Sequence, residues 1–232
     1  MQMTEVSNYK KQNIIGDRID LLIKQLGAEN CAEQKMANHG LVRFGRPAVK
    51  YLCEALTHDR AVVRSGAAKA LGAIADSSAA QPLLEILNDS DNLVRKEVAF
   101  ALGELKASIA VSALCDSLED QNLEVRKESV WALYKIGDRR AVTRLLSCLQ
   151  ETDKYLKLRA ITVLGAFQSV ESVPFLIELL SDEEEVQKEV IRSLGKIGCP
   201  DALPALTGLA NENNKELADV LNEAVSMIDR ST

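Results

Sequence analysis

Five copies of one phrase of about thirty residues fill most of this 232-residue chain. The second position of each phrase is apolar and recurs at steps of 31, 31, 31 and 30 residues, at Val63, Val94, Val125, Leu156 and Val186. A fixed period between about 20 and 50 residues is typical of a solenoid, in which each unit buries its apolar face only by stacking on its neighbours. The repeats therefore predict one continuous core that runs through the whole array.

Each repeat is predicted to form two helices. In the second copy the apolar residues are spaced 4, 4 and 3 apart, which is one face of an α-helix: Val94, Val98, Leu102 and Leu105. The following segment supplies a second helix, as in AAQPLLEIL and SVPFLIELL, and proline falls in its first turn, where the missing N–H costs little. Polar linkers such as NDSD and ETDK then offer N-caps for the next repeat.

We therefore predict an all-α chain of about fourteen helices, an α-solenoid in which stacked hairpins form a right-handed superhelix with a period of about 31 residues. The prediction is a single domain over residues 1–232, with regular repeats over 45–210. Residues 1–44 are interpreted as an N-terminal cap followed by a degraded repeat, and residues 211–232 as a C-terminal capping helix, because the terminal units must cover the exposed core.

Composition argues against several classes of function. The net charge of −6, with no basic cluster, disfavours binding to nucleic acid or to an anionic membrane surface. No apolar run approaches the ~20 residues that span a bilayer, and the N-terminus lacks a signal-peptide pattern, so we expect a soluble, cytoplasmic protein. The five cysteines show no CxxC spacing and are expected to be reduced and buried, and His39 and His58 have no partner at metal-ligand spacing. We therefore expect no metal site. The sequence shows no nucleophile–base pair, so it leaves open whether the protein is an enzyme.

The phrase VRSGAAKALGAIAD (63–76) and its continuation AAQPLLEIL resemble the HEAT-like repeat of phycobilin lyases of the E/F type, over roughly residues 45–210. Members of that family act on phycobiliproteins of light-harvesting antennae, and relatives take part in phycobilisome degradation. The resemblance implies that the partner is a phycobiliprotein subunit and that a bilin such as phycocyanobilin is the substrate or ligand. It implies no tightly bound cofactor, and it is compatible with a homo- or heterodimer. The repeat also occurs in scaffolds unrelated to bilins, and that alternative stays open.

A comparison of the repeats separates constant from variable positions. With the Arg column as position zero, the core face of the first helix is predicted at −1, +3, +6, +7 and +10, and the opposite face at +1, +5 and +8. The resemblance implies that this opposite face lines the concave side. The binding residues predicted on it are Lys96, Phe100, Lys127, Trp131, Tyr134, Thr162 and Arg192.

The aromatic residues of this set suggest a hot spot for a protein or for a planar carboxylate ligand, with Lys96 and Lys127 as charge partners. The alternative is that Phe100 and Trp131 lean sideways and pack between repeats. Arg64, Arg95 and Arg126 are interpreted as a structural ladder that pairs with the acidic linkers, rather than as phosphate or substrate ligands. The run 182–185 is interpreted as a solvated helix start, or else as a docking site for a basic partner.

Overall fold

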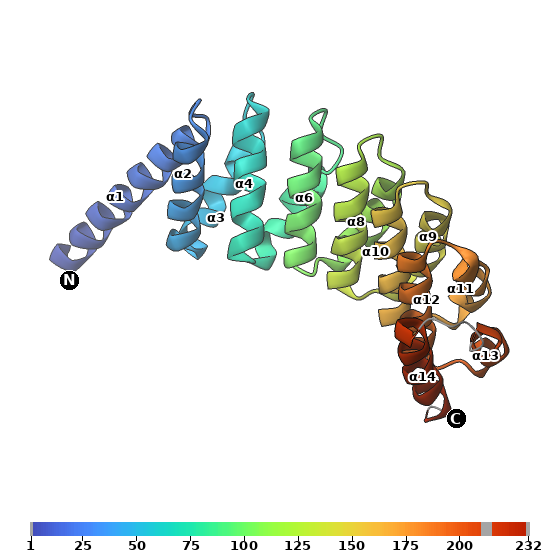
Figure 1. Cartoon of the computed structure of the whole chain (residues 1–232). Helices are drawn as coiled ribbons and strands as arrows, with labels where there is room; N and C mark the ends of the chain where they lie inside the picture. The colour runs from blue at the N-terminus through green and yellow to red at the C-terminus, as the bar shows by residue number, and fades with distance from the viewer. Residues whose placement is uncertain (1, 210–214, 231–232) are drawn as a thin grey trace. The chain divides into compact units, whose positions relative to one another are not determined.

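The computed structural model describes residues 2–209 and 215–230, and this part of the chain is helical, without strands (Figure 1). The prediction of an all-α fold is therefore confirmed. The α-helices are α1 Gln2–Leu26, α2 Cys31–Phe44, α3 Arg46–Ala55, α4 Ala61–Ile74, α5 Ala80–Glu85, α6 Asn92–Glu104, α7 Val111–Asp116, α8 Leu123–Ile136, α9 Val142–Ser147, α10 Lys154–Ala166, α11 Val173–Glu178, α12 Glu184–Ile197, α13 Leu203–Leu209 and α14 Lys215–Asp229. Short 3₁₀ helices flank the second helices: η1 Ser77–Ala79, η2 Ser108–Ala110, η3 Ser117–Glu119, η4 Arg139–Ala141, η5 Cys148–Gln150, η6 Val170–Ser172, η7 Leu179–Ser181 and η8 Pro200–Ala202.

Each repeat combines one long and one short helix. The first helices α4, α6, α8, α10 and α12 have 13 or 14 residues, whereas the second helices from α5 to α13 have 6 or 7. The linkers supply the caps: the Asp91 side chain accepts hydrogen bonds from the first turn of α6, Asn122 does so for α8 and Asp153 for α10. These caps satisfy N–H groups that a helix start leaves without partners, and so fix where each repeat begins.

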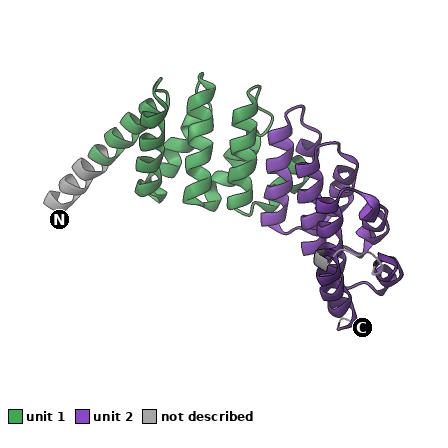
Figure 2. Ribbon diagram, in the orientation of Figure 1, with its two compact units in different colours: residues 1–114 green, residues 115–232 purple. Residues whose placement is uncertain are grey.

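The chain divides into two compact units, residues 1–114 and 115–232 (Figure 2). In unit 1, α4 packs along α6 and α1 packs on α2. In unit 2, α10 packs along α12, and α12 packs along α14. Within each unit the helical hairpins stack side by side, as an α-solenoid requires, and the single domain over residues 1–232 stays a prediction.

The terminal helices α1 and α14 lie in the segments predicted as caps, and their capping role stays a prediction. α1 spans Gln2–Leu26, within the predicted N-terminal cap and degraded repeat of residues 1–44. α14 occupies the segment predicted as the closing helix, and it buries Leu217, Leu221, Ala224 and Ile228. The expected boundary between regular repeats and this helix, at residues 210 and 211, lies outside the described residues.

The buried face of each first helix is wider than predicted. Positions +4 and +8 are also buried, for example Ala68 and Gly72 in α4. The predicted exposure of +8 is wrong wherever glycine occupies it, and Ser65 at +1 is buried as well. The reason is geometric, because a first helix contacts its own hairpin partner and also the first helices of the neighbouring repeats. A single amphipathic face accounts only for the first of these contacts.

None of the helices in the described part of the chain combines the length and the apolar character that a bilayer-spanning segment needs.

Candidate functional site

Within each of the two units, first helices of neighbouring repeats approach each other through a glycine at position +8. In unit 1, a Cβ atom added to Gly72 of α4 would lie 2.8 Å from the Cα of Ala101 in α6. In unit 2, a Cβ added to Gly165 of α10 would lie 2.9 Å from the Cα of Ser193 in α12. Position +8 of one repeat therefore packs directly on position +6 of the next, and only glycine leaves room for this approach.

The pair α8 and α10 breaks this rule. At the same two positions stand Tyr134 and Val163, each the bulkiest residue of its column in the five repeats. α8 and α10 accordingly contact each other less extensively than α10 and α12 do. At this interface two bulky residues therefore stand where other repeats have glycine and a small residue.

A cleft of about 340 Å³ lies between the two helices. Three residues of α8 and four of α10 line it: Glu124, Lys127, Trp131, Tyr155, Leu158, Arg159 and Thr162. Three of the predicted binding residues, Lys127, Trp131 and Thr162, are therefore brought together at one place in unit 2. Their binding role stays a prediction.

The exposed rings of Trp131 and Tyr155 line this cleft, and the ring of Tyr134 lies beside that of Trp131. Trp131 and Tyr134 are each 38% exposed, and their ring centroids lie 4.9 Å apart, so the two rings support each other at the surface. Tyr155 is 61% exposed, and the Nζ atoms of Lys127 and Lys154 lie 5.6 and 5.7 Å from its ring centroid. Large apolar side chains that remain this exposed are typical of a binding surface.

The charges in the cleft are arranged differently from the prediction. The Lys127 side chain is only 13% exposed, and its Nζ lies 3.4 Å from carboxylate oxygens of both Glu124 and Asp153. Its charge is therefore already balanced inside the protein, and it is not the free charge partner that we expected. The pKa of Asp153 lies below its ordinary value: burial opposes ionisation, but the N–H of Leu156 and the ammonium of Lys127 outweigh it.

Arg159 was not predicted, yet it carries a guanidinium group into the same cleft. Its Nη1 donates a hydrogen bond to the Lys127 carbonyl oxygen at 2.8 Å, which ties α10 to α8. Position +2 is glutamate in three of the five repeats, at Glu97, Glu128 and Glu189, so Arg159 reverses the charge of its column. This reversal is the sequence signal that would have identified it.

Thr162 and the predicted binding residues outside the cleft have structural partners. Thr162 of α10 donates to Glu189 of α12 at 2.8 Å, which links the two helices, and Arg192 lies 3.5 Å from the same carboxylate within α12. In unit 1, Lys96 lies 3.7 Å from the Glu97 carboxylate. Phe100 is half-buried and its ring contacts α4 at Gly72, which is the sideways packing that the alternative interpretation described.

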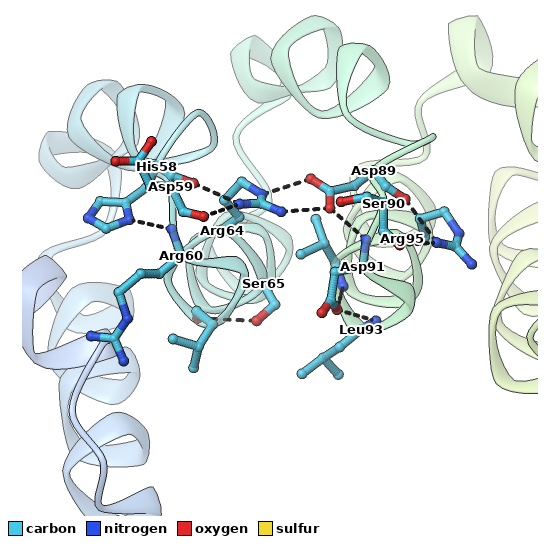
Figure 3. A network of polar contacts seen from close by, with 12 residues as sticks. His58, Asp59, Arg60, Arg64, Ser65, Asp89, Ser90, Asp91, Leu93 and Arg95 are labelled. Carbon is cyan, nitrogen blue, oxygen red and sulfur yellow. Dashed lines mark hydrogen bonds and ion pairs between the residues drawn. The ribbon is translucent and has the colours of Figure 1, made fainter.

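The predicted arginine ladder lies at the start of the first helices (Figure 3). Arg64 donates two hydrogen bonds of 2.7 Å to the Asp89 carboxylate of the following linker, and its Nη1 also donates to the carbonyl oxygens of His58 and Asp59. Arg95 repeats the second contact, since its Nη1 donates to the Asp89 carbonyl oxygen at 2.8 Å. Each guanidinium thus donates hydrogen bonds to carbonyl oxygens of the linker before its own helix. Arg64 also binds the Asp89 side chain in the following linker.

In unit 2 the column continues with weaker side-chain pairs. Arg126 donates to the Asp120 carbonyl oxygen at 2.8 Å, and its Nε lies 3.6 Å from a Glu151 carboxylate oxygen, too far for a hydrogen bond. Lys157 lies 2.8 Å from Asp182 and holds the pKa of that carboxyl below its ordinary value. The cations at position zero are therefore engaged by the linkers of the repeats, which leaves few of these positive charges for a ligand.

Cysteine and histidine contribute no metal centre in the described residues, where no group of three or more potential ligands gathers. Cys115, Cys148 and Cys199 are buried, Cys53 is half-buried and Cys31 is exposed, so the expectation of five buried cysteines is wrong for Cys31. Burial raises the pKa of the Cys148 thiol to about 11, which keeps it protonated at neutral pH.

The geometry defines a class: an α-solenoid of stacked helical hairpins that carries an aromatic cleft between two first helices. A family model for HEAT repeats matches residues 19–97, 80–155 and 142–226. The chain therefore belongs to the HEAT-repeat family. A search of curated proteins finds no significant match.

Similar solved structures share this fold at low sequence identity. The complex of CpcE and CpcF of phycocyanin lyase from Nostoc sp. PCC7120 is 22% identical over 90% of this chain and 94% of that chain, with a TM-score of 0.55. A designed armadillo repeat protein in complex with the peptide (KR)4 has the same identity and TM-score, over 90% and 98% of the two chains. Kap95p, in a structure with RanGDP, is 18% identical over 92% of this chain and 35% of that chain, with a TM-score of 0.73.

Proposed function

We propose that this protein holds a phycobiliprotein subunit together with its bilin, and that it assists attachment or detachment of the chromophore. The surface around the α8/α10 cleft, with Trp131, Tyr134 and Tyr155, is the proposed contact region. The observation that carries the proposal is this exposed aromatic cluster on a fold shared with phycocyanin lyase. A cytoplasmic location, the bilin as a ligand and a homo- or heterodimer are parts of the same proposal.

Physical chemistry supports a protein as the main partner. Exposed tryptophan and tyrosine are enriched among the residues that contribute most to protein–protein affinity. A cleft of about 340 Å³ is near the lower limit of pockets that enclose a small molecule, which span about 300–1,000 Å³. A bilin would therefore be held against this surface by its carrier protein rather than enclosed by this chain alone.

The second candidate function is a HEAT-repeat scaffold that binds a protein unrelated to bilins. The similar structures favour it, since they include a designed repeat protein with a peptide and Kap95p with RanGDP. The same aromatic surface would then hold a different partner, and no tetrapyrrole would be involved.

Mixing the full chain with free phycocyanobilin and with chromophorylated phycocyanin separates the two functions. Under the first proposal, bilin absorption or fluorescence changes and phycocyanin is retained on the immobilised protein. Unchanged spectra together with no retention would refute the bilin proposal and leave the scaffold.

A pair of alanine variants then tests the surface. Trp131→Ala is expected to weaken phycocyanin binding by about 2 kcal/mol, the cost of losing a hot-spot side chain, with helicity unchanged. Phe175→Ala is the matched control, because Phe175 is 42% exposed but lies on α11, outside the cleft. Equal affinity of the two variants would exclude the cleft as the contact region.

A further inference from the structure

Among the described residues, one cation that lines the α8/α10 cleft has no ion-pair partner. Lys127 pairs with Glu124 and Asp153, and Lys154 outside the cleft pairs with Glu183 and Glu185. For Arg159, by contrast, no carboxylate of the described residues lies within ion-pair distance. Its hydrogen bond to the Lys127 carbonyl oxygen engages one Nη1–H, and a guanidinium has five N–H donors.

The repeat explains why this charge is unpaired. In the next repeat interface, Glu189 at position +2 accepts a hydrogen bond from Thr162 at position +5 of the preceding repeat. At the α8/α10 interface the same two positions hold Arg159 and Trp131, so an aromatic ring stands where a polar partner would be. Arg159 therefore lines the cleft without the cross-interface side-chain contact that Glu189 makes in the next repeat.

Three departures from the repeat thus meet at one interface. Tyr134 and Val163 are the bulkiest residues of their columns, and Arg159 places a positive charge in the cleft between the two helices. A guanidinium binds carboxylates through two parallel N–H bonds, and this preference is strongest where water is partly excluded. Trp131 and Tyr155 border the charge with exposed rings, which favour an apolar group beside the carboxylate.

We propose that the α8/α10 cleft is a carboxylate-binding subsite for a partner protein, in which Arg159 binds an Asp or Glu side chain. Trp131 and Tyr155 contact the apolar residue beside that side chain. Tyr134 is a positioning residue that keeps the cleft open. The inference rests on the proposed function only in taking the partner to be a protein, and it adds the chemistry by which that partner is recognised.

Trp131 is the only tryptophan of the chain, so its indole NMR signal reports directly on the cleft. The probe is the peptide acetyl-Gly-Leu-Glu-Leu-Gly-amide, compared with the same peptide carrying glutamine. We expect the glutamate peptide to shift the indole signal with a Kd of about 1 mM, and the glutamine peptide to bind about tenfold more weakly. Added salt should weaken the glutamate peptide alone.

Variants assign the effect to the residues. Arg159→Gln should bind both peptides equally weakly, and Arg159→Lys should recover part of the preference, because lysine keeps the charge but loses the paired geometry. Tyr134→Gly should allow α8 and α10 to close, so that the glutamate peptide binds about tenfold more weakly although every lining residue is retained. Tyr134→Phe preserves the bulk of the ring and should bind like the wild type.

Several results would overturn the subsite. These are equal affinity for the two peptides, unchanged affinity in Arg159→Gln, or no shift of the indole signal at concentrations several times the expected Kd. A shift by phycocyanobilin that requires Arg159, with none by the peptide, would reassign the charge to a bilin carboxylate. Retention of phycocyanin by Arg159→Gln at full affinity would refute the subsite and leave the proposed function intact. Binding of the peptide without any binding of phycocyanin would refute the proposed function and leave the subsite intact.

Discussion

The close approach at Gly165 gives a quantitative test of how the repeats stack. A Cβ atom at this position would lie 2.6 Å from the Oγ of Ser193, 2.7 Å from its Cβ and 2.9 Å from its Cα. Carbon atoms pack best at about 3.5–4.0 Å, so Gly165→Ala requires α10 and α12 to separate by roughly 1 Å. The backbone of α12 is one of the clashing groups, so a rotamer change of Ser193 cannot relieve the whole strain.

The expected destabilisation follows from three contributions. Overpacking of this kind costs about 1–3 kcal/mol. The separation also stretches the buried hydrogen bond that Ser193 donates to the Ile161 carbonyl oxygen at 3.1 Å, a loss of about 1 kcal/mol. Replacing glycine by alanine in a helix contributes up to about 1 kcal/mol in the opposite direction. The sum predicts that Gly165→Ala lowers the free energy of unfolding by about 1–3 kcal/mol.

Gly208→Ala is the matched control. Gly208 is the penultimate residue of α13 as Gly165 is of α10, and no neighbouring atom of the described residues lies within 4 Å of the position its Cβ would take. With no clash against the described residues, this variant keeps the gain in helix propensity and should be as stable as the wild type or more stable by up to about 1 kcal/mol. Urea unfolding followed by far-UV circular dichroism and by Trp131 emission measures both variants. If Gly165→Ala proved as stable as Gly208→Ala, the interpretation of position +8 as a contact point between repeats would be wrong.

Further predictions concern the linkers, the thiols and a helix end. Asp89→Asn should cost about 3 kcal/mol at about pH 7, because it leaves the largely buried Arg64 without its carboxylate. Burial opposes ionisation of Asp89, but Arg64 and the N–H of Asp91 outweigh it and keep its pKa below the ordinary value. The wild type should therefore lose this stabilisation as the pH falls below about 4, whereas urea titrations of the variant should lack that loss. Alkylation followed by mass spectrometry should modify exposed Cys31 in the native protein, and Cys148 only after unfolding, since burial raises the pKa of Cys148 to about 11. Ala75→Gly should raise the free energy of unfolding by about 1 kcal/mol, seen as a higher urea midpoint. Ala75 ends α4 with φ of 55°, a conformation that glycine adopts without strain.

The periodicity of the sequence was sufficient to predict the fold. The spacing of apolar residues identified each first helix, and the linkers identified its start, because capping and burial are local requirements. The same reasoning missed the burial of +4 and +8. The spacing of apolar residues in one helix predicts a single buried face. Gly72 and Ala68 are buried by residues of other repeats, and the sequence of α4 alone does not show how closely those repeats approach.

The candidate site was only partly predictable. Trp131 and Tyr134 were identified because aromatic residues interrupt otherwise small or polar columns. Lys127 was expected to be a charge partner for a ligand, which requires an unpaired ammonium group. Its ion pair with Asp153 joins two repeats, and a comparison of equivalent positions in the first helices cannot reveal such a contact. Arg159 could not be predicted from the face opposite the core, because position +2 lies at the boundary between that face and the next repeat.

Departures from the repeat are therefore more informative than the repeat itself. A column that is constant in all copies serves stacking, because every interface needs the same approach of helix to helix. A single bulky residue in such a column would be destabilising, as argued for Gly165. Tyr134 and Val163 depart together, at the two positions that face each other across one interface, and the charge of the adjoining column reverses at Arg159 in the same place. Stacking alone gives no reason for three such changes to coincide, whereas a cleft that must stay open and hold an anion requires all three.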